Sequence, residues 1–267
     1  MDEMMSQLSE IWKFRFFWLS LVKMDLKLRY RGTVLGIGWS LLQPILMTVV
    51  FCVIFSSWHG RAEWRYDAPY FLAGLTIFGF IRDSVTWGCQ NFFKNEPYIR
   101  QCPLPLAIYP LRTILGLIIH FGISLSVTIA SVLLLTPGSG LDRIVALAAS
   151  LPALGLLFIF GWSISVLAGF AQVYFQDVQH LSDVVFQIFF FLTPILFKTD
   201  LLIEKGVGWL GTYNPVVWFL ELIRTPLLTG EFAATHYYGY ASAVTAVTLT
   251  GALLTMKHLE KRIIFHL

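Results

Sequence analysis

The sequence has few charged residues and none of the short motifs that bind nucleotides or catalytic metals. Asp, Glu, Lys and Arg make up 13% of the 267 residues, whereas they make up roughly 25% of a soluble domain. The sequence contains no G-x-x-x-x-G-K-[ST] phosphate loop, no H-E-x-x-H or G-x-S-x-G motif and no paired Cys/His zinc spacing. A water-soluble fold is therefore not expected, and any work driven by ATP would need a separate ATPase chain.

Cysteine is scarce as well, and the net charge is small. Cys52, Cys89 and Cys102 are an odd number without C-x-x-C spacing, so we expect no disulfide framework. The net charge of +3 does not indicate a basic face for nucleic acid. The first ten residues are acidic and polar. They do not resemble a removable signal peptide, which has a basic start followed by an apolar run.

Long apolar runs are abundant and extend from one end of the chain to the other. Hydrophobic residues make up 57% of the sequence. A helix needs about 20 apolar residues to cross the hydrocarbon layer, because its backbone polar groups must be bonded internally there. We therefore predict an all-α integral membrane protein with one transmembrane domain over 34–267 and six spans, near 34–55, 70–89, 107–135, 144–170, 184–197 and 237–256.

The region between the last two predicted spans is interrupted by helix breakers. Its apolar pieces are too short to cross a bilayer, and Gly and Pro residues separate them. Such pieces are typical of re-entrant helices that enter the membrane and return on the same side, where protein covers them. We predict re-entrant helices over 206–230, with breakers at Pro194, Gly206, Gly208, Gly211, Pro215 and Pro226.

The segment ahead of the first span mixes aromatic and basic residues. Residues 11–31 hold Trp12, Phe14, Phe16, Phe17 and Trp18 among six Lys and Arg residues. This mixture favours an amphipathic helix lying on the membrane surface. Residues 1–33 are accordingly predicted to form a cytoplasmic N-terminus and an interface helix. The alternative is an ordinary positive flank of the first span.

Basic residues near the span ends predict the orientation of the chain. Positive residues are retained in the cytoplasm. They are concentrated ahead of the first span, between the second and third spans, and in the C-terminal tail, where Lys257, Lys261 and Arg262 lie. Both termini are therefore predicted to be cytoplasmic.

Arg82 and Asp83 fall within the second predicted span, and His120 falls within the third. Arg82 and Asp83 are adjacent and point about 100° apart on a helix, so we expect them to be poorly placed to pair with each other. They would instead face a cavity or lock onto a neighbouring span. His120 is more typical of a hydrogen-bonded packing residue than of a proton relay.

Aromatic residues make up 16% of the chain, and their rings can stack on sugar faces as well as anchor helices at the membrane interface. Composition does not separate these roles. The candidates for lining a saccharide path are Trp39, Trp87, Phe93, Trp162 and Phe190. For each of them, anchoring or core packing is the alternative.

Three sequence blocks point to one family. The first runs KMDLKLRYRGTVLGIGWSLLQP over 23–44, and the second runs NEPYIRQCPLP over 95–105. The third comprises YFQDVQHL over 174–181, TPI over 193–195, NP over 214–215 and ELIRTPLLTG over 221–230. In this order they resemble the membrane subunits of type-2 ATP-binding-cassette exporters for polysaccharides and polyol phosphates, particularly the O-antigen permeases. Gln176 departs from the pattern, since the family usually has Arg there.

The resemblance implies an assembly and a substrate. It implies a homodimer of six-span subunits in the bacterial cytoplasmic membrane, in contact with membrane lipids, with a lumen at the dimer interface. Two separate ATPase subunits would hold ATP and Mg, so this chain would have no cofactor and no catalytic or metal site of its own. The substrate would be a lipid-linked polysaccharide, most simply an O-antigen.

The resemblance also implies roles for particular residues. The segment that couples to the ATPase, or gates the cytoplasmic side, would be Lys94, Asn95, Glu96, Pro97, Tyr98, Ile99 and Arg100. The periplasmic gate over 206–230 would include Asn214, Pro215, Trp218, Glu221 and Arg224. As a mechanistic hypothesis, the guanidinium groups of Arg29, Arg31 and Arg100 attract the lipid diphosphate, because arginine matches phosphate bidentately; the alternative is that they only set the topology.

Other functions stay open from the sequence. A permease of the same superfamily could carry capsular polysaccharide, teichoic acid, or a small drug or lipid. An ion-coupled carrier would need more acidic or His residues at the midplane than this chain has. A membrane-embedded transferase acting on lipid-linked sugars would need a cluster of carboxylates or His, and the nearest is Asp177, His180 and Asp183. We interpret those three as a polar turn and helix start.

Overall fold

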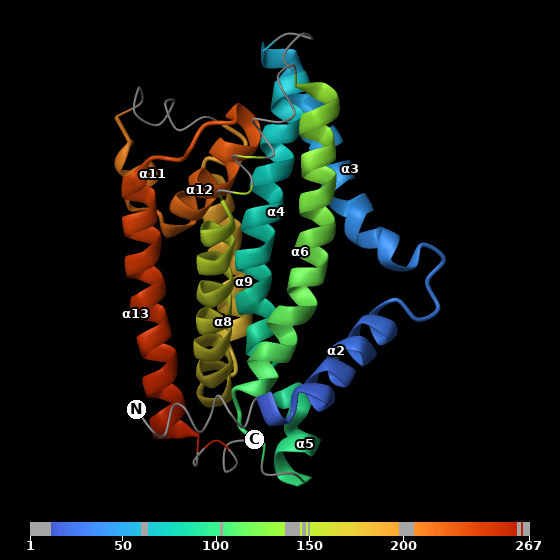
Figure 1. Cartoon of the computed structure of the whole chain (residues 1–267), viewed down its shortest axis with the longest axis vertical. Coiled ribbons are helices and arrows are strands. Elements are labelled where there is room, and N and C mark those ends of the chain that lie inside the picture. Colours follow the sequence, from blue (N-terminus) through green and yellow to red (C-terminus); the bar gives the residue numbers. More distant parts are fainter. Residues whose placement is uncertain are drawn as a thin grey trace.

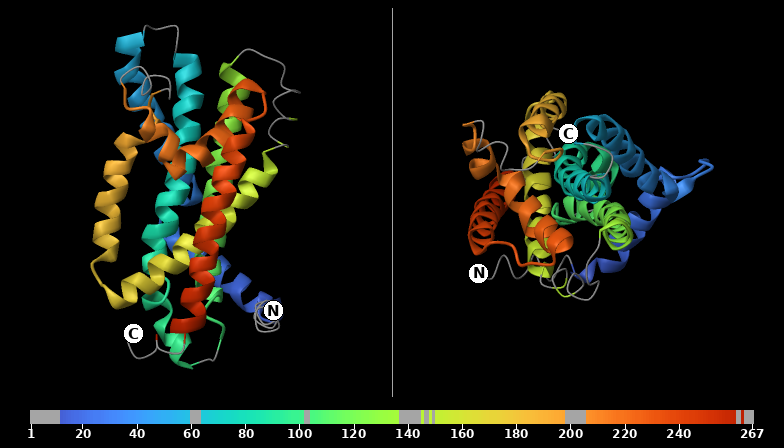
Figure 2. Two further views of the ribbon diagram at one scale, coloured as in Figure 1. Left: turned by 90° about the vertical axis from the view of Figure 1, so that its left-hand side faces the viewer. Right: turned by 90° about the horizontal axis from the view of Figure 1, so that it is seen from above.

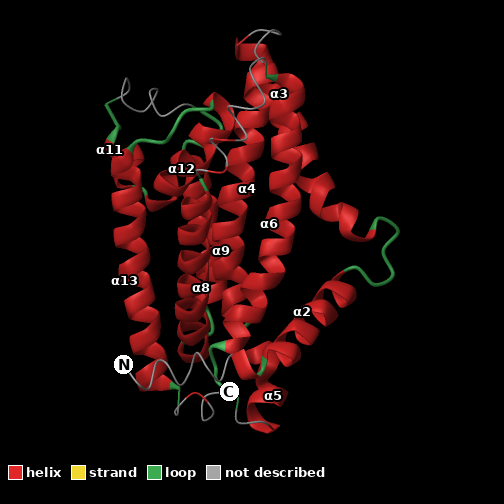
Figure 3. Cartoon of the chain, viewed as in Figure 1, coloured by secondary structure: helices red, strands yellow, loops and turns green. Residues whose placement is uncertain are grey.

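The computed structural model describes residues 12–59, 64–101, 104–136, 145, 148, 150–197, 206–260 and 263. Every regular element within these residues is a helix (Figure 3), which confirms the predicted all-α class. The acidic start at 1–10, Cys102, residues 144, 146, 147 and 149 of the predicted 144–170 span, and Lys261 and Arg262 of the tail lie outside the described residues.

The helices lie where the apolar runs predicted them. The described elements are α2 (Arg15–Arg29), the 3-10 turn Gly36–Gly38, α3 (Trp39–His59), α4 (Trp64–Cys89), the 3-10 turn Phe93–Asn95, α5 (Glu96–Gln101), α6 (Ile108–Leu135), α8 (Leu151–Tyr174), α9 (Val178–Leu192), α11 (Trp209–Tyr213), α12 (Pro215–Thr229) and α13 (Thr235–Leu259). By length and composition, α6, α8 and α13 can each cross a membrane, and α3 and α9 contain shorter apolar stretches. The count of six spans stays a prediction.

Helices α3 and α9 differ from their predicted bounds for local reasons. Helix α3 begins at Trp39 rather than near residue 34. The preceding turn contains Gly32 and Gly36 at φ of 79° and 53°, a left-handed conformation that glycine adopts most readily. Helix α9 begins at Val178, before the predicted 184, because its first turns are polar yet helical. It ends at Leu192, since Thr193 precedes Pro194 and is extended, with ψ of 135°.

Helices α4 and α8 pack closely at the centre of the bundle. A Cβ on Gly88 of α4 would lie 2.8 Å from Ser165 Cα of α8, and one on Gly169 would lie 3.0 Å from the Gly88 carbonyl oxygen. Small residues of this kind let helices in a membrane approach closely enough for backbone contact. Helix α6 packs on α4 and α13 packs on α8, so these four helices form the core of the bundle (Figure 1).

The short helices α11 and α12 lie at one end of this bundle. The last turns of α3 and the first turns of α4 lie toward the same end, and the first turns of α2 and the last turns of α13 lie at the opposite end (Figures 1 and 2). Helix α12 packs against α4, α8 and α13. Asn214 caps its start by accepting a hydrogen bond from Val216 N, and Gly230 ends it at φ of 77°. Two short helices therefore occupy the stretch predicted to be re-entrant, and re-entry itself stays a prediction.

Helix α2 lies obliquely across the other end of the bundle, below α3 (Figure 1). Its exposed apolar side chains include Phe16, Leu19 and Leu28, and they alternate with exposed basic residues. The predicted helix is present, and its position on a membrane surface stays a prediction.

The expectation for Arg82 and Asp83 was wrong. Their side chains pair directly, with Arg82 Nε and Nη2 donating to Asp83 Oδ1 at 2.9 and 2.7 Å. Both side chains are partly exposed. The arginine stem is long and flexible, so it bends toward its neighbour despite their different directions around α4.

Candidate functional site

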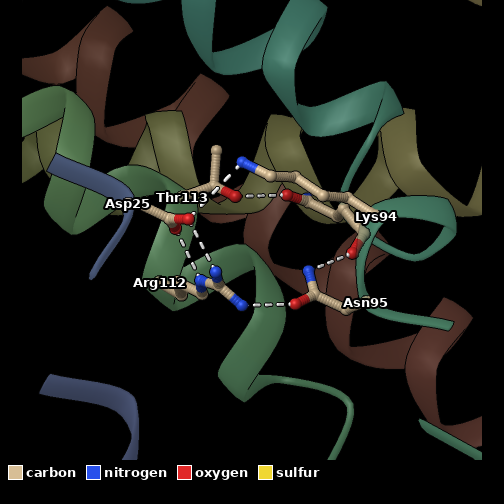
Figure 4. A network of polar contacts seen from close by, with 6 residues as sticks. Asp25, Lys94, Asn95, Arg112 and Thr113 are labelled. Atoms are coloured by element: carbon tan, nitrogen blue, oxygen red, sulfur yellow. Dashed lines mark hydrogen bonds and ion pairs between the residues drawn. The ribbon is translucent and has the colours of Figure 1, made fainter. Parts of the chain in front are cut away.

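A buried ion pair joins α2 to α6 at the end of the bundle where α2 lies. Arg112 of α6 donates from Nε to Asp25 Oδ2 and from Nη2 to Asp25 Oδ1, both at 2.6 Å (Figure 4). Two parallel bonds between guanidinium and carboxylate give a fixed, planar geometry. Because the Arg112 side chain is only 5% exposed, this carboxylate is its essential counter-charge.

Hydrogen bonds extend the pair to the end of α4. Arg112 Nη1 donates to Asn95 Oδ1 at 2.5 Å, and Asn95 Nδ2 donates to the Asn91 carbonyl oxygen at 2.6 Å. Thr113 Oγ1 donates to Asn91 Oδ1 at 2.6 Å. Lys94 Nζ lies 3.5 Å from Asp25 Oδ1 (Figure 4). The network thus connects α2, α6 and the turn that leads into α5.

A cavity of about 340 Å³ adjoins this network, and we call it the inner cavity. It is lined by α2, the end of α4 with the following 3-10 turn, and α6. The Arg29 guanidinium lies 4.8 Å from the centre of the Trp87 ring in its wall, a cation–π geometry. His120 also lines it and is held by Ser40 Oγ at 2.8 Å and Tyr30 Oη at 3.0 Å. His120 is thus hydrogen-bonded, as predicted.

The segment predicted to couple to an ATPase forms a 3-10 turn followed by α5. Helix α5 lies at the extreme end of the molecule (Figure 1), where Pro97 and Arg100 are exposed. Arg100 Nε pairs with Glu96 Oε1 at 2.7 Å. Ile99 is buried, and the Tyr98 ring meets the Phe17 ring of α2 edge-on at 6.1 Å. A displacement of α5 would therefore act directly on α2.

The three arginines predicted to attract a lipid diphosphate do not lie together. Arg29 and Arg31 are at the C-terminal end of α2 and in the turn after it, whereas Arg100 is on α5. Helix α5 contacts α2 at Phe17, which precedes Arg29 by 12 residues, or roughly 18 Å of helix. Only Arg29 of the three lines the inner cavity.

The five candidate path aromatics are also distributed over different parts of the fold. Trp39 is exposed at the start of α3, and Trp87 lines the inner cavity. Phe93 and Trp162 pack against the buried cluster around Phe92 and Phe170. Phe190 of α9 contacts the rings of Phe51, Phe78 and Phe191.

Two of the residues predicted to form the outer gate, Asn214 and Arg224, bond to residues directly after α9. Asn214 Nδ2 donates to Thr193 Oγ1 at 2.9 Å, and Pro215 starts α12. Arg224 is 2% exposed; it donates to the Pro194 carbonyl oxygen at 2.9 Å and lies 3.9 Å from the centre of the Tyr70 ring. Trp218 and Glu221 bond within their own region, to the Thr212 carbonyl oxygen and to Thr225 Oγ1.

The polar turn between α8 and α9 has the predicted form. Asp177 precedes α9, His180 is exposed, and Asp183 accepts a hydrogen bond from Thr86 at 3.2 Å. Within the described residues, no group of three or more His, Cys, Asp or Glu side chains is placed to hold a metal ion. Gln176 is exposed and bonds through its carbonyl oxygen, which accepts from Gln172 Nε2 at 2.6 Å.

Sequence reasoning missed Asp25 and the burial of Arg112. From the sequence, Arg112 was considered only as one of the basic residues between the second and third spans that predict orientation. Asp25 lies in the block over 23–44 that resembles the family, but no role was predicted for it. One signal was available, because Asp25 is the only acid among six basic residues in 11–31.

These features define a multi-pass helical membrane protein with an ion-pair network where α2 meets α6. The sequence matches the family described as ABC-2 type transporter over residues 17–228, and the chain belongs to that family. It is therefore the membrane subunit of a transporter that works with ATP-binding cassette subunits.

Three relatives carry the name O-antigen export system permease protein RfbA. Two come from Klebsiella pneumoniae; each is 25% identical, over 241 and 236 residues, covering 87% of this chain and 85% of the relative. The third, from Myxococcus xanthus, is 25% identical over 213 residues and covers 78% of each chain. The match to permeases confirms the predicted family.

Proposed function

We propose that this chain is the membrane half of an exporter that carries a lipid-linked O-antigen polysaccharide across the bacterial cytoplasmic membrane. The observation that carries the proposal is the similarity to O-antigen export permeases along most of the chain. Two copies form the transmembrane unit, and two ATPase subunits supply ATP hydrolysis. The lumen runs between the two copies, because one small bundle does not enclose a path wide enough for a hydrated polymer.

The cytoplasmic end carries the contact with the ATPase. Helix α5 projects from the end of the bundle (Figure 1) and touches α2 through Tyr98 and Phe17. The network around Asp25 and Arg112 connects the same region to α6. Movement imposed on α5 would thus reach both helices. In this orientation, the beginning of α2 and the end of α13 face the cytoplasm.

The opposite end forms the outer gate. Helices α11 and α12 lie there (Figure 2), and Asn214 and Arg224 fix the connection from α9 through Thr193 and Pro194. Opening the path requires this connection to move, so the hydrogen bonds from Asn214 and Arg224 set the closed position.

Deletion of the chain from its native bacterium tests the proposal. We expect cells without it to lose surface O-polysaccharide and to accumulate the lipid-linked polymer inside, with recovery when the wild-type chain is restored. The measurement is immunoblotting of lipopolysaccharide together with extraction of intracellular lipid-linked glycan. Normal O-polysaccharide combined with loss of capsule, teichoic acid or drug resistance would assign the chain to another substrate.

A further inference from the structure

The inner cavity has the charge and shape of an anion site. We propose that it binds the phosphate-bearing head group of the lipid that carries the exported glycan, an inference that rests on the proposed function. Its lining includes the basic side chains of Arg29, Lys94 and Arg112 and the carboxylate of Asp25. The cavity therefore holds two more positive than negative charges, which matches a diphosphate linking a lipid to a sugar, with one negative charge on each phosphate.

Arg112 and Asp25 form the fixed part of the site. Three donor atoms of Arg112 are engaged, by Asp25 and Asn95, so its side chain does not need to move when an anion arrives. Its charge still acts on the cavity through the low-dielectric surroundings. Asp25 orients Arg112 and also keeps Lys94 close.

Lys94 and Arg29 are the groups free to reach the ligand. The Lys94 side chain is 55% exposed, and its Nζ lies 3.5 Å from Asp25 Oδ1. A strong charge-assisted hydrogen bond is shorter, at about 2.7–2.9 Å. The ammonium can therefore exchange this contact for a phosphate oxygen. The Arg29 guanidinium carbon lies 4.8 Å from the centre of the Trp87 ring, a cation–π contact that leaves its N–H donors available for phosphate.

The rest of the lining indicates a lipid rather than a soluble anion. Leu26, Leu28 and Leu117 contribute apolar surface beside the charged groups. The cavity lies beside the start of α6, next to the apolar length of that helix. Helix α2 forms one wall of the cavity and also carries exposed apolar residues. A molecule with a phosphate and a hydrocarbon chain satisfies both kinds of surface.

The inner cavity differs from a general basic rim at the membrane surface. Arg100 pairs with Glu96 on α5, and Arg31 is exposed in the turn after α2. Neither lines the cavity. The convergence of Arg29, Lys94 and Arg112 comes from three separate elements, so it depends on tertiary packing rather than on local charge density.

Binding to the complete exporter, reconstituted in phosphatidylcholine nanodiscs, tests the inference. The probe is a radiolabelled polyprenyl diphosphate, and unlabelled polyprenol and inorganic diphosphate are the competitors. The variant Arg29→Gln/Lys94→Gln is expected to bind the probe at least tenfold more weakly. The matched control Arg15→Gln/Lys23→Gln removes the same charge from α2 outside the cavity and is expected to bind like the wild type. Size-exclusion profiles verify that each variant is folded.

Three results would overturn the assignment. They are wild-type affinity in the cavity variant, an equal loss of affinity in the control, and displacement of the probe by inorganic diphosphate at concentrations equal to that of the lipid. The last result would make this a site for a soluble anion. The proposed function is tested separately, by O-polysaccharide export. If a complex exports O-polysaccharide but does not bind the probe, the proposed site is wrong and the proposed function still holds.

Discussion

Among the described residues, Asp25 is the single carboxylate in the lining of the inner cavity, and its two oxygens face Arg112 and Lys94. Charges near a membrane are retained where they are paired or face water. Here the pairing also fixes helix α2, which otherwise extends away from the core (Figure 1). The same carboxylate therefore serves the fold and the proposed head-group site.

Removing both members of this pair should cost less than the two single removals added together. We expect Asp25→Asn or Arg112→Gln alone to destabilise the chain by about 2–3 kcal/mol, toward the low end for a buried pair because Asp25 is 25% exposed. The double variant should lose less than the sum, since neither group is then left uncompensated. Denaturation in detergent micelles measures all four forms. Strictly additive losses would show that the two groups are not coupled.

At the scale of elements, the contact between α4 and α8 depends on glycine. A methyl group on Gly88 would collide with the Ser165 backbone of α8, whereas one on Gly79 of the same helix would meet nothing within 4 Å. We expect Gly88→Ala to destabilise the bundle by about 1–3 kcal/mol, because backbone must move to admit the new atom. The matched Gly79→Ala variant should be neutral or more stable, since alanine favours a helix. Comparison of melting temperatures in detergent tests this, and equal effects would argue against close α4–α8 packing.

Helix α5 is short, exposed and placed for contact with a partner. We expect Arg100→Glu to reduce the amount of ATPase that co-purifies with the chain several-fold, because the new carboxylate repels Glu96 and reverses the charge of this surface. Arg65→Glu, a matched exposed change near the start of α4 at the opposite end of the bundle, serves as the control. Quantifying both subunits on a gel provides the measurement. Equal loss of the ATPase in the two variants would place the contact elsewhere.

At the scale of the whole molecule, the two ends of the bundle should face different compartments. We expect a cysteine introduced at Glu231, between α12 and α13, to react with an impermeant maleimide in intact spheroplasts. A cysteine at Pro97 on α5 should react only after the membrane is opened. The background is a chain with Cys52, Cys89 and Cys102 replaced by alanine. The reverse pattern would invert the proposed orientation.

The positions of the helices could be predicted because they follow from local composition. The run predicted at 107–135 forms α6 over Ile108–Leu135, since a long apolar stretch in a bilayer can satisfy its backbone only as a helix. Boundaries were less predictable where polar residues continue a helix, as in the first turns of α9. The prediction that Arg82 and Asp83 do not pair was wrong. It considered only the angle between adjacent side chains around a helix, whereas the long arginine side chain can bend toward its neighbour.

The sequence by itself determined that this chain is a helical membrane protein of the ABC-2 type transporter family, since apolar length and short motif blocks are local properties of the chain. Only the tertiary structure decided which polar groups meet. Asp25, Lys94 and Arg112 are separated by up to 87 residues in their contacts, and they converge because α2 packs on α6 beside the end of α4. Helix packing brings together residues that no local pattern connects, so the inner cavity exists only in the folded chain.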